Sequence, residues 1–279
     1  MENQTKTWFI TGASKGFGLE FIKQLLAKGD NVAATSRTLE GLTAAAGTHE
    51  NLLPLAVNLI DEQSVALAIK QTVERFGRLD VVVNNAGYGL FGAVEELSDA
   101  EARNNFDVNV FGALNVVRQA MPHLRKQQGG HIFNISSIGG FTGGFAGFGI
   151  YCATKFAMSG FTEALAVEAK PFNINVTLVL PGYFRTNFLE SDSLVTPKNI
   201  IDDYKDARES HDIHTQQINH NQPGDPVKGV AEMIKIAAVE NPPVCFFLGS
   251  DAVEVAGKKI ASVQEEIAAW KHSSTATNF

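Results

Sequence analysis

Short runs of apolar and β-branched residues alternate with longer amphipathic segments along most of this chain of 279 residues. A short apolar run predicts a strand, and apolar residues spaced three and four apart predict a helix. The predicted strands span residues 7–11, 31–36, 52–57, 79–84, 131–136, 175–180 and 244–248. The predicted helices span residues 17–28, 39–46, 62–76, 99–126, 150–170, 227–238 and 251–270. Such alternation with right-handed crossovers gives an α/β fold, a doubly wound parallel sheet of about seven strands with helices on both faces.

Composition favours a single domain over residues 1–279, because 44% of the residues are hydrophobic and no linker-like shift or internal repeat interrupts them. A net charge of −7 gives no footprint for nucleic acid or for an anionic membrane surface. Apolar runs stay shorter than the roughly 18 residues of a membrane span. Without a signal pattern, and with 2 distant cysteines, the chain is expected to be cytoplasmic.

The segment 187–226 is more polar than its surroundings and is expected to lack a sheet pattern. Its histidines His211, His214 and His220 lack the clustered carboxylates of a metal site, so we predict solvated side chains and no metal. Residues 272–279 are predicted to be disordered.

A glycine-rich turn follows the first predicted strand, in the stretch TGASKGFG at 11–18. Glycine allows positive φ and lets backbone N–H groups approach an anion. The following helix would present its positive N-terminal end to that anion. A plain strand-to-helix turn is the alternative, but the G-x-x-x-G-x-G spacing at this place favours a phosphate-binding turn.

The end of the second predicted strand reads Thr35-Ser36-Arg37, with no acidic residue before Glu40. An NAD site usually has Asp or Glu there, which accepts hydrogen bonds from the ribose 2′-hydroxyl. An arginine can instead pair with a 2′-phosphate, and Lys15 could add a second cation. Two solvated surface cations are the alternative. We therefore favour NADPH/NADP+ over NADH/NAD+ as cofactor.

Tyr151 and Lys155 are four residues apart in a predicted helix, which places them on one face. A free phenol has a pKa near ~10 and transfers protons poorly at neutral pH. A positive charge held close lowers that pKa, as a proton-transferring tyrosine needs. The pair is common on helices by chance, so its meaning depends on the other motifs.

Five motifs in order resemble those of the short-chain dehydrogenase/reductase family, in its shorter type with TGxxxGxG spacing. They are TGASKGFG at 11–18, NNAG at 84–87, NVFG at 109–112, ISS and YCATK within 135–155, and PGYFRT at 181–186. The resemblance covers about residues 5–187. It implies a Rossmann-like fold, an oxidoreductase, and a variable substrate lid at about 187–226.

The resemblance also implies which residues hold the cofactor. On the adenosine and pyrophosphate side these are Gly12, Ser14, Lys15, Gly16, Phe17, Gly18, Ser36, Arg37, Asn58, Leu59, Asn85, Ala86 and Gly87. On the nicotinamide side they are Tyr151, Lys155, Pro181, Gly182, Phe184 and Thr186. Asn58 stands where the family usually has Asp, yet its amide oxygen can still accept from the adenine amino group.

The implied catalytic residues are Asn109, Ser137, Tyr151 and Lys155. Tyr151 would give a proton to the substrate carbonyl oxygen, which Ser137 would hydrogen-bond. Lys155 would bind the nicotinamide ribose and lower the tyrosine pKa. Asn109 would hold a water in the proton path through a local distortion of its helix.

The serine is one position further from the tyrosine than the family usually has it. Ser137 precedes Tyr151 by fourteen residues instead of thirteen. One extra residue in the loop 139–149 explains the spacing, and we assign Ser137 with Ser136 as the alternative.

Aromatic residues near the catalytic motifs suggest an apolar ketone, aldehyde or secondary alcohol as substrate. The expected substrate contacts are Ser137, Phe141, Phe145, Tyr151, Tyr183 and Phe188. The leading hypothesis is an NADP(H)-dependent carbonyl reductase of hydrophobic small molecules, and the resemblance implies a homodimer or homotetramer. The alternatives are a non-catalytic dinucleotide-sensing or scaffolding protein, an NAD-preferring alcohol dehydrogenase, and an epimerase or dehydratase with bound NAD. Both Tyr151 and Lys155 are present, which argues against the first, and the glycine spacing argues against the last.

Overall fold

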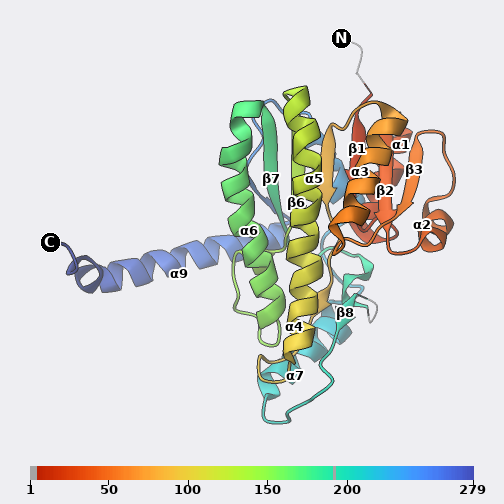
Figure 1. The fold of residues 1–279 in the computed structure, drawn as a ribbon. Helices are drawn as coiled ribbons and strands as arrows, with labels where there is room; N and C mark the ends of the chain where they lie inside the picture. The colour runs from red at the N-terminus through yellow and green to blue at the C-terminus, as the bar shows by residue number, and fades with distance from the viewer. Residues whose placement is uncertain (1–4, 191–192) are drawn as a thin grey trace.

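A parallel sheet of seven strands forms the centre of the molecule, in a computed structural model that describes residues 5–190 and 193–279 (Figure 1). The strands are β1 (Thr7–Ile10), β2 (Asn31–Ser36), β3 (Leu52–Ala56), β4 (Val81–Asn84), β6 (Gly130–Ile135), β7 (Ile174–Pro181) and β9 (Cys245–Leu248). Their order in the sheet is β3-β2-β1-β4-β6-β7-β9. The predicted doubly wound fold is confirmed. Strand order reverses between β1 and β4, and in such sheets ligands bind at the carboxyl ends beside that point.

Helices cover both faces of the sheet because successive side chains of each strand point to opposite sides. The helices are α1 (Gly16–Ala27), α2 (Leu39–Ala46), α3 (Glu62–Phe76), α4 (Asp99–Phe106), α5 (Gly112–Gln127), α6 (Gly149–Ala169), α7 (Lys205–Asp212), α8 (Pro226–Ile236) and α9 (Ser250–Thr275). Trp8 and Ile10 of β1 pack on the face covered by α1 and α8, whereas Phe9 packs on the face covered by α3, α5 and α6.

The helix predicted over 99–126 is divided. A π-helical segment, η1 (Asp107–Phe111), separates α4 from α5. Such segments widen one turn of a helix and often occur at functional sites. The distortion lies at Asn109, where the sequence motif led us to expect one.

The segment predicted to lack a sheet pattern contains a short strand, which corrects that expectation. β8 (Leu194–Val195) pairs in parallel with β5 (Gly89–Leu90), which follows β4. The segment continues into α7 and a second π-helical segment, η5 (Ile213–Ile218). A two-residue strand has too short an alternation to be recognised in sequence.

The end of the chain also differs from expectation, because α9 continues to Thr275 and makes residues 272–275 helical. Beyond Gly257 the chain has no glycine or proline and many good helix formers, which explains the continuation. α9 runs outward from the body of the molecule (Figure 1). Most of its side chains are exposed. Among the described residues, no helix combines the length and apolarity that crossing a membrane requires.

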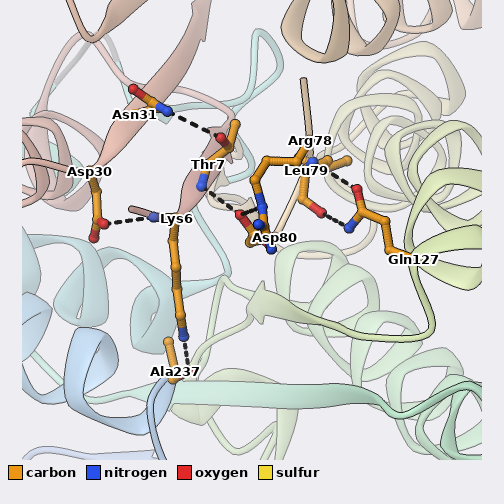
Figure 2. A network of polar contacts seen from close by, with 9 residues as sticks. All are labelled: Lys6, Thr7, Asp30, Asn31, Arg78, Leu79, Asp80, Gln127 and Ala237. Carbon is orange, nitrogen blue, oxygen red and sulfur yellow. Dashed lines mark hydrogen bonds and ion pairs between the residues drawn. The ribbon is translucent and has the colours of Figure 1, made fainter. Parts of the chain in front are cut away.

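The amino ends of the strands are fastened by a network of polar contacts (Figure 2). The backbone N–H of Thr7 donates to Asp80 Oδ2 at 2.8 Å, and that of Lys6 donates to Asp30 Oδ1 at 2.9 Å. Lys6 Nζ reaches the carbonyl oxygen of Ala237 at 2.9 Å, at the end of α8. These contacts fix the sheet at its amino edge and leave the carboxyl edge to form a site.

A buried histidine in β6 makes stability depend on pH. His131 is 3% exposed, and its ring stacks on that of Phe133 with centroids 4.0 Å apart. Its Nε2 lies 2.9 Å from Thr177 Oγ1, which itself donates to the Pro243 carbonyl oxygen at 2.8 Å. Nε2 must therefore carry the ring proton, and Nδ1 is a buried bare nitrogen. Burial lowers the pKa of His131 from 6.5 to about 3.

We expect the free energy of unfolding to fall as pH decreases from about 6.5 toward 3, by up to ~1.4 kcal/mol per pH unit. In that window the unfolded chain binds a proton that the folded chain excludes, so protonation favours unfolding. Urea unfolding across the window should show a smaller slope for His131→Gln, whereas His49→Gln, at an exposed histidine, should keep the wild-type slope. Equal slopes in wild type and His131→Gln would contradict this account.

Candidate active site

A cavity of about 700 Å³ lies along the carboxyl ends of the strands, where the sequence analysis placed a ligand. It begins at the glycine turn after β1 and passes the ends of β2, β3 and β4. It then reaches the ends of β6 and β7 and the segments around β8 and η5. The predicted cofactor and catalytic residues therefore come from separate strands but lie around one space.

The glycine turn needs glycine for close approach as well as for backbone angle. Gly12 has φ of +65°, and a Cβ there would lie 2.8 Å from Ala86 Cα. A Cβ on Gly18 would lie 2.5 Å from the Gly12 carbonyl oxygen. Thr11 Oγ1 accepts hydrogen bonds from the backbone N–H groups of Asn85 and Ala86, both at 3.0 Å. These contacts join the turn to the end of β4 and hold both beside the start of α1.

The predicted cofactor residues line the cavity with one exception. Gly18 is buried beneath the turn and supports its packing, so it does not face the ligand space. Lys15, Ser36 and Arg37 form the end of the cavity beyond β2. The remaining predicted residues on the wall are Gly12, Ser14, Gly16, Phe17, Asn58, Leu59, Asn85, Ala86, Gly87, Tyr151, Lys155, Pro181, Gly182, Phe184 and Thr186.

Tyr151 and Lys155 lie on the first turns of α6, beside the end of β6. Lys155 is 4% exposed, and its Nζ donates to the Ile135 carbonyl oxygen at 2.9 Å. Nζ lies 5.8 Å from the centroid of the Tyr151 ring. The Tyr151 ring is 7% exposed and lies with its centroid 5.7 Å from that of Phe188. Backbone and rings thus fix both side chains at the cavity wall.

Burial controls the acid–base chemistry of this pair. It raises the pKa of Tyr151 above the usual range for a phenol, and a hydrogen bond with Ser137 works in the opposite direction. Burial also lowers the pKa of Lys155 to about 8, so its ammonium form still dominates at neutral pH. Desolvation of the phenolate outweighs the lowering influence, so the net shift of the Tyr151 pKa is upward, and a lowering contribution from the Lys155 charge stays a prediction. The phenol therefore stays protonated, as a proton donor must.

The two candidate serines are used differently. Ser136 is 5% exposed, and its hydroxyl donates to the Lys155 carbonyl oxygen at 3.1 Å. Ser137 Oγ accepts from the Gly139 backbone N–H at 3.1 Å, which leaves its own proton for another acceptor. Both serines lie at the cavity, and Ser137 is the one that also interacts with the Tyr151 hydroxyl. The geometry therefore favours Ser137 as the partner of Tyr151.

Asn109 is fully buried and does not line the cavity. Its Oδ1 accepts from the Tyr88 backbone N–H at 3.0 Å, and its Nδ2 donates to the Tyr88 carbonyl oxygen at 3.0 Å. Nδ2 also reaches Thr154 Oγ1 at 3.1 Å. The side chain therefore joins η1, the segment after β4 and α6, which places it in a supporting position behind Tyr151.

The substrate side of the cavity has apolar walls. Phe145, Tyr183 and Phe188 line it as predicted, but Phe141 does not. The Phe141 ring packs against that of Phe247 with centroids 5.0 Å apart, in the core between β9 and α6. The loop 139–149 turns back onto the sheet after Ile138, so its first phenylalanine enters the core and the later ones face the cavity.

The segment 187–226, predicted to be a substrate lid, contributes a buried histidine to the cavity that the sequence did not reveal. His214 was predicted to be solvated but is 8% exposed and lines the cavity, whereas His220 is exposed. The Phe148 ring packs against that of His214, and the Phe91 ring packs against that of Phe148. The sequence places His214 four residues after Ser210, a spacing at which a helical side chain can reach the Ser210 carbonyl oxygen. This spacing does not reveal whether the histidine is buried.

The sequence and the fold of this chain are similar to those of known dehydrogenases. A sequence profile described as short chain dehydrogenase matches residues 6–194. The oxidoreductase BOA17 of Botryotinia fuckeliana is 34% identical over 275 residues, which span 98% of this chain and 99% of that protein. A solved short-chain dehydrogenase from Streptomyces avermitilis has a TM-score of 0.89 at 35% identity, over 99% of this chain and 100% of that chain.

Solved structures of similar fold also contain nicotinamide cofactors. A short chain dehydrogenase from Burkholderia cenocepacia J2315, in complex with NADP, has a TM-score of 0.74 at 26% identity, over 96% of this chain and 98% of that chain. NAD is bound in another chain of the same fold. A preference between the two cofactors therefore has to be argued from the residues of this chain.

Proposed function

This chain belongs to the short-chain dehydrogenase/reductase family and is an oxidoreductase, and from that premise we propose that it is an NADPH-dependent carbonyl reductase. Its substrates would be ketones or aldehydes of hydrophobic small molecules, with the alcohol oxidised in the reverse direction. One observation carries the proposal. The protonated Tyr151, Ser137 and the Lys155 ammonium meet at one wall of a cavity whose other end carries Lys15 and Arg37.

The residues present fit a nicotinamide dinucleotide. The glycine turn and the N-terminal end of α1 suit a pyrophosphate, and the cavity continues from there to Tyr151. Thr186 and Gly182 would hold the nicotinamide end, and Asn58 and Leu59 the adenine end. When bound, the cofactor supplies the hydride of the reaction.

Tyr151 would donate its phenolic proton to the carbonyl oxygen of the substrate. Ser137 would donate a hydrogen bond to the same oxygen as negative charge develops there. Positioned proton transfer of this kind contributes roughly 10²–10⁴-fold to the rate. The apolar wall formed by Phe145 and Phe188 would exclude water from these groups and strengthen both hydrogen bonds.

Lys155 would act through its charge and its fixed position. Its Nζ uses one donor on the Ile135 carbonyl oxygen, and the other two donors are available for ribose hydroxyls and for a water. Its charge would stabilise the tyrosinate left after proton transfer. Asn109 would support this arrangement from behind by fixing Tyr88 and Thr154. That the distortion at η1 also holds a water of the proton path stays a prediction.

Preference for NADPH tests the cofactor part of the proposal. We expect kcat/KM for NADPH to exceed that for NADH by about 10-fold or more, because a charge-assisted hydrogen bond contributes ~1.5–3 kcal/mol. Arg37 is exposed beside the cavity, so it can reach a 2′-phosphate without paying for burial. Ketone reduction measured with each cofactor gives the ratio directly.

A matched pair of variants separates a specific cation from overall charge. Arg37→Asp should abolish the NADPH preference or reverse it. Lys126→Ala, at an exposed lysine near the end of α5, should leave the ratio unchanged. Faster turnover with NADH in the wild type would refute the assignment of NADPH.

We also propose that the chain forms a homodimer or homotetramer through two long helical stretches, α4 to α5 and α6, which lie side by side (Figure 1). Exposed apolar side chains on α6 support the proposal, with Phe156 44% and Val167 74% exposed. Light scattering of the purified protein should give the mass of a dimer or a tetramer. The mass of a monomer would contradict the proposed homo-oligomer. Reduction of any ketone by NADPH would exclude the alternative of a non-catalytic dinucleotide-sensing protein.

A further inference from the structure

The cavity wall carries a second tyrosine whose hydroxyl is held by a buried histidine. Tyr183 lies two residues beyond β7, and His214 lies in η5 of the lid. Tyr183 Oη lies 2.8 Å from His214 Nε2, and both residues line the cavity. The backbone N–H of Tyr183 donates to Asp251 Oδ2 at 2.6 Å. Tyr183 is thus fixed at its backbone and at its hydroxyl.

The hydrogen-bond partners determine which nitrogen of His214 carries the proton. Nδ1 lies 2.6 Å from the Ser210 carbonyl oxygen, which can only accept, so Nδ1 carries the proton. Burial lowers the pKa of His214, so the ring is neutral near pH 7. Nε2 is then a bare nitrogen that can only accept. The hydroxyl of Tyr183 must therefore donate to it.

This direction decides what Tyr183 offers to a ligand. A phenol has a single proton, and here that proton is engaged by His214. Burial raises the pKa of Tyr183 to about 12, so the hydroxyl does not ionise under ordinary conditions. Toward the cavity its oxygen can then only accept a hydrogen bond. Tyr151 differs, because it has to donate to the substrate.

We propose that Tyr183, oriented by His214, is a specificity-determining residue that accepts a hydrogen bond from the substrate. The preferred substrates would be apolar ketones or aldehydes that also carry a hydroxyl or amino group. The carbonyl oxygen would face the donors of Tyr151 and Ser137, and the added donor group would face Tyr183. The inference rests on the carbonyl reductase function proposed above.

The aromatic wall beside Tyr183 would make its hydrogen bond with the substrate selective. Phe148 packs against His214 with ring centroids 4.8 Å apart and against Tyr151 at 6.2 Å, so the three residues form one wall. An apolar wall offers a substrate hydroxyl few partners, and one left unpaired there is costly. A substrate whose hydroxyl or amino group reaches Tyr183 would therefore bind more tightly than the parent ketone. A substrate whose donor group lies against the apolar wall would bind more weakly.

Ketone pairs that differ only in the donor test the proposal. Acetophenone, propiophenone and butyrophenone would each be compared with the derivative that carries a terminal hydroxyl or amino group, with NADPH as reductant. The quantity measured is the ratio of kcat/KM between derivative and parent ketone. In the wild type we expect this ratio to reach about tenfold for at least one chain length. In Tyr183→Phe it should fall to about one.

The ratio compares two substrates on one protein, so overall damage in a variant cancels. A wild-type ratio near one at every chain length, or an unchanged ratio in Tyr183→Phe, would overturn the inference. In both cases, measured turnover of the parent ketones would still support the proposed carbonyl reductase function. Absence of turnover with every ketone would instead refute that function.

Variants of His214 test the orienting role. His214→Leu removes the acceptor and frees the tyrosine proton, so the ratio should fall as in Tyr183→Phe. His214→Gln places an amide oxygen that can accept from Tyr183, and it should restore part of the ratio. A ratio that stays at the wild-type value in His214→Leu would show that Tyr183 acts without the histidine and would overturn its assigned role.

Discussion

Replacing Tyr151 with phenylalanine is expected to lower kcat for ketone reduction by about 10²–10⁴-fold and to leave NADPH binding largely intact. The substitution removes only the hydroxyl, and the ring keeps its packing against Phe148 and Phe188. The cofactor cradle at the glycine turn lies at the other end of the cavity and is unaffected. Steady-state kinetics and titration of NADPH fluorescence measure the two effects separately.

Lys155→Ala should differ by weakening both turnover and NADPH binding. The buried ammonium touches the Ile135 carbonyl oxygen and lies beside the Tyr151 ring, so its loss removes a donor and a charge. Lys170→Ala, at an exposed lysine just after α6, is the control and should behave as wild type. Near-normal activity of Tyr151→Phe would mean that another group supplies the proton.

The pKa of Tyr151 adds a dependence on pH to this prediction. Burial holds the pKa above its usual range, so the proton-donating form persists below that raised pKa. Reduction should therefore decline in alkaline solution first through loss of the Lys155 charge, whose pKa is about 8, and not through ionisation of Tyr151. Oxidation of the alcohol needs the deprotonated form and should accelerate as pH rises.

The sequence predicted the sheet well because its signals are local. Each strand is a short apolar run between turns, and its predicted ends lie within two residues of the observed ones. The catalytic motifs could be recognised equally well in the sequence, because each of them directly follows a predicted strand or lies on the next predicted helix. The π-helical segment at Asn109 was expected only through the motif, because both flanking helices continue the same periodicity.

Side-chain direction was the part that the sequence could not give. Phe141 and Phe145 lie in one glycine-rich loop, yet only Phe145 faces the cavity. The lid histidines look alike in sequence, but His214 is buried against Phe148 and His220 is exposed. In each case the outcome depends on contacts with segments distant in the chain.

Glu96 is the strongest example of a residue whose side-chain direction the sequence does not reveal, because nothing in the sequence distinguishes it from Glu95. Its side chain is fully buried and forms an ion pair of 2.5 Å with Arg208 of α7, which is 31% exposed. Glu96 also accepts from the backbone N–H groups of Ala93 and Ile201, both at 2.8 Å. Burial alone would raise the pKa of Glu96, but these hydrogen bonds and the Arg208 charge outweigh it and hold the pKa low. One carboxylate thus joins the segment after β5 to Ile201 and to α7, within the segment predicted to be a substrate lid.

Replacing Glu96 with glutamine should therefore damage both stability and substrate binding. Breaking a buried ion pair costs ~3–5 kcal/mol, and partial exposure of Arg208 reduces this to about 2–3 kcal/mol of unfolding free energy. The Arg208 guanidinium lies 5.7 Å from the centroid of the Phe91 ring, which packs on Phe148 at the substrate wall. KM for the ketone should consequently rise more than KM for NADPH.

An exposed ion pair provides the control for this experiment. Glu62 pairs with Arg118 at 3.0 Å, and the two side chains are 46% and 50% exposed. Glu62→Gln should change the unfolding free energy by no more than about 1 kcal/mol and leave both KM values unaltered. Urea unfolding and steady-state kinetics of the two variants give the comparison. If both variants lost the same small amount of stability and kept wild-type KM values, Glu96 would not hold the lid against the substrate wall.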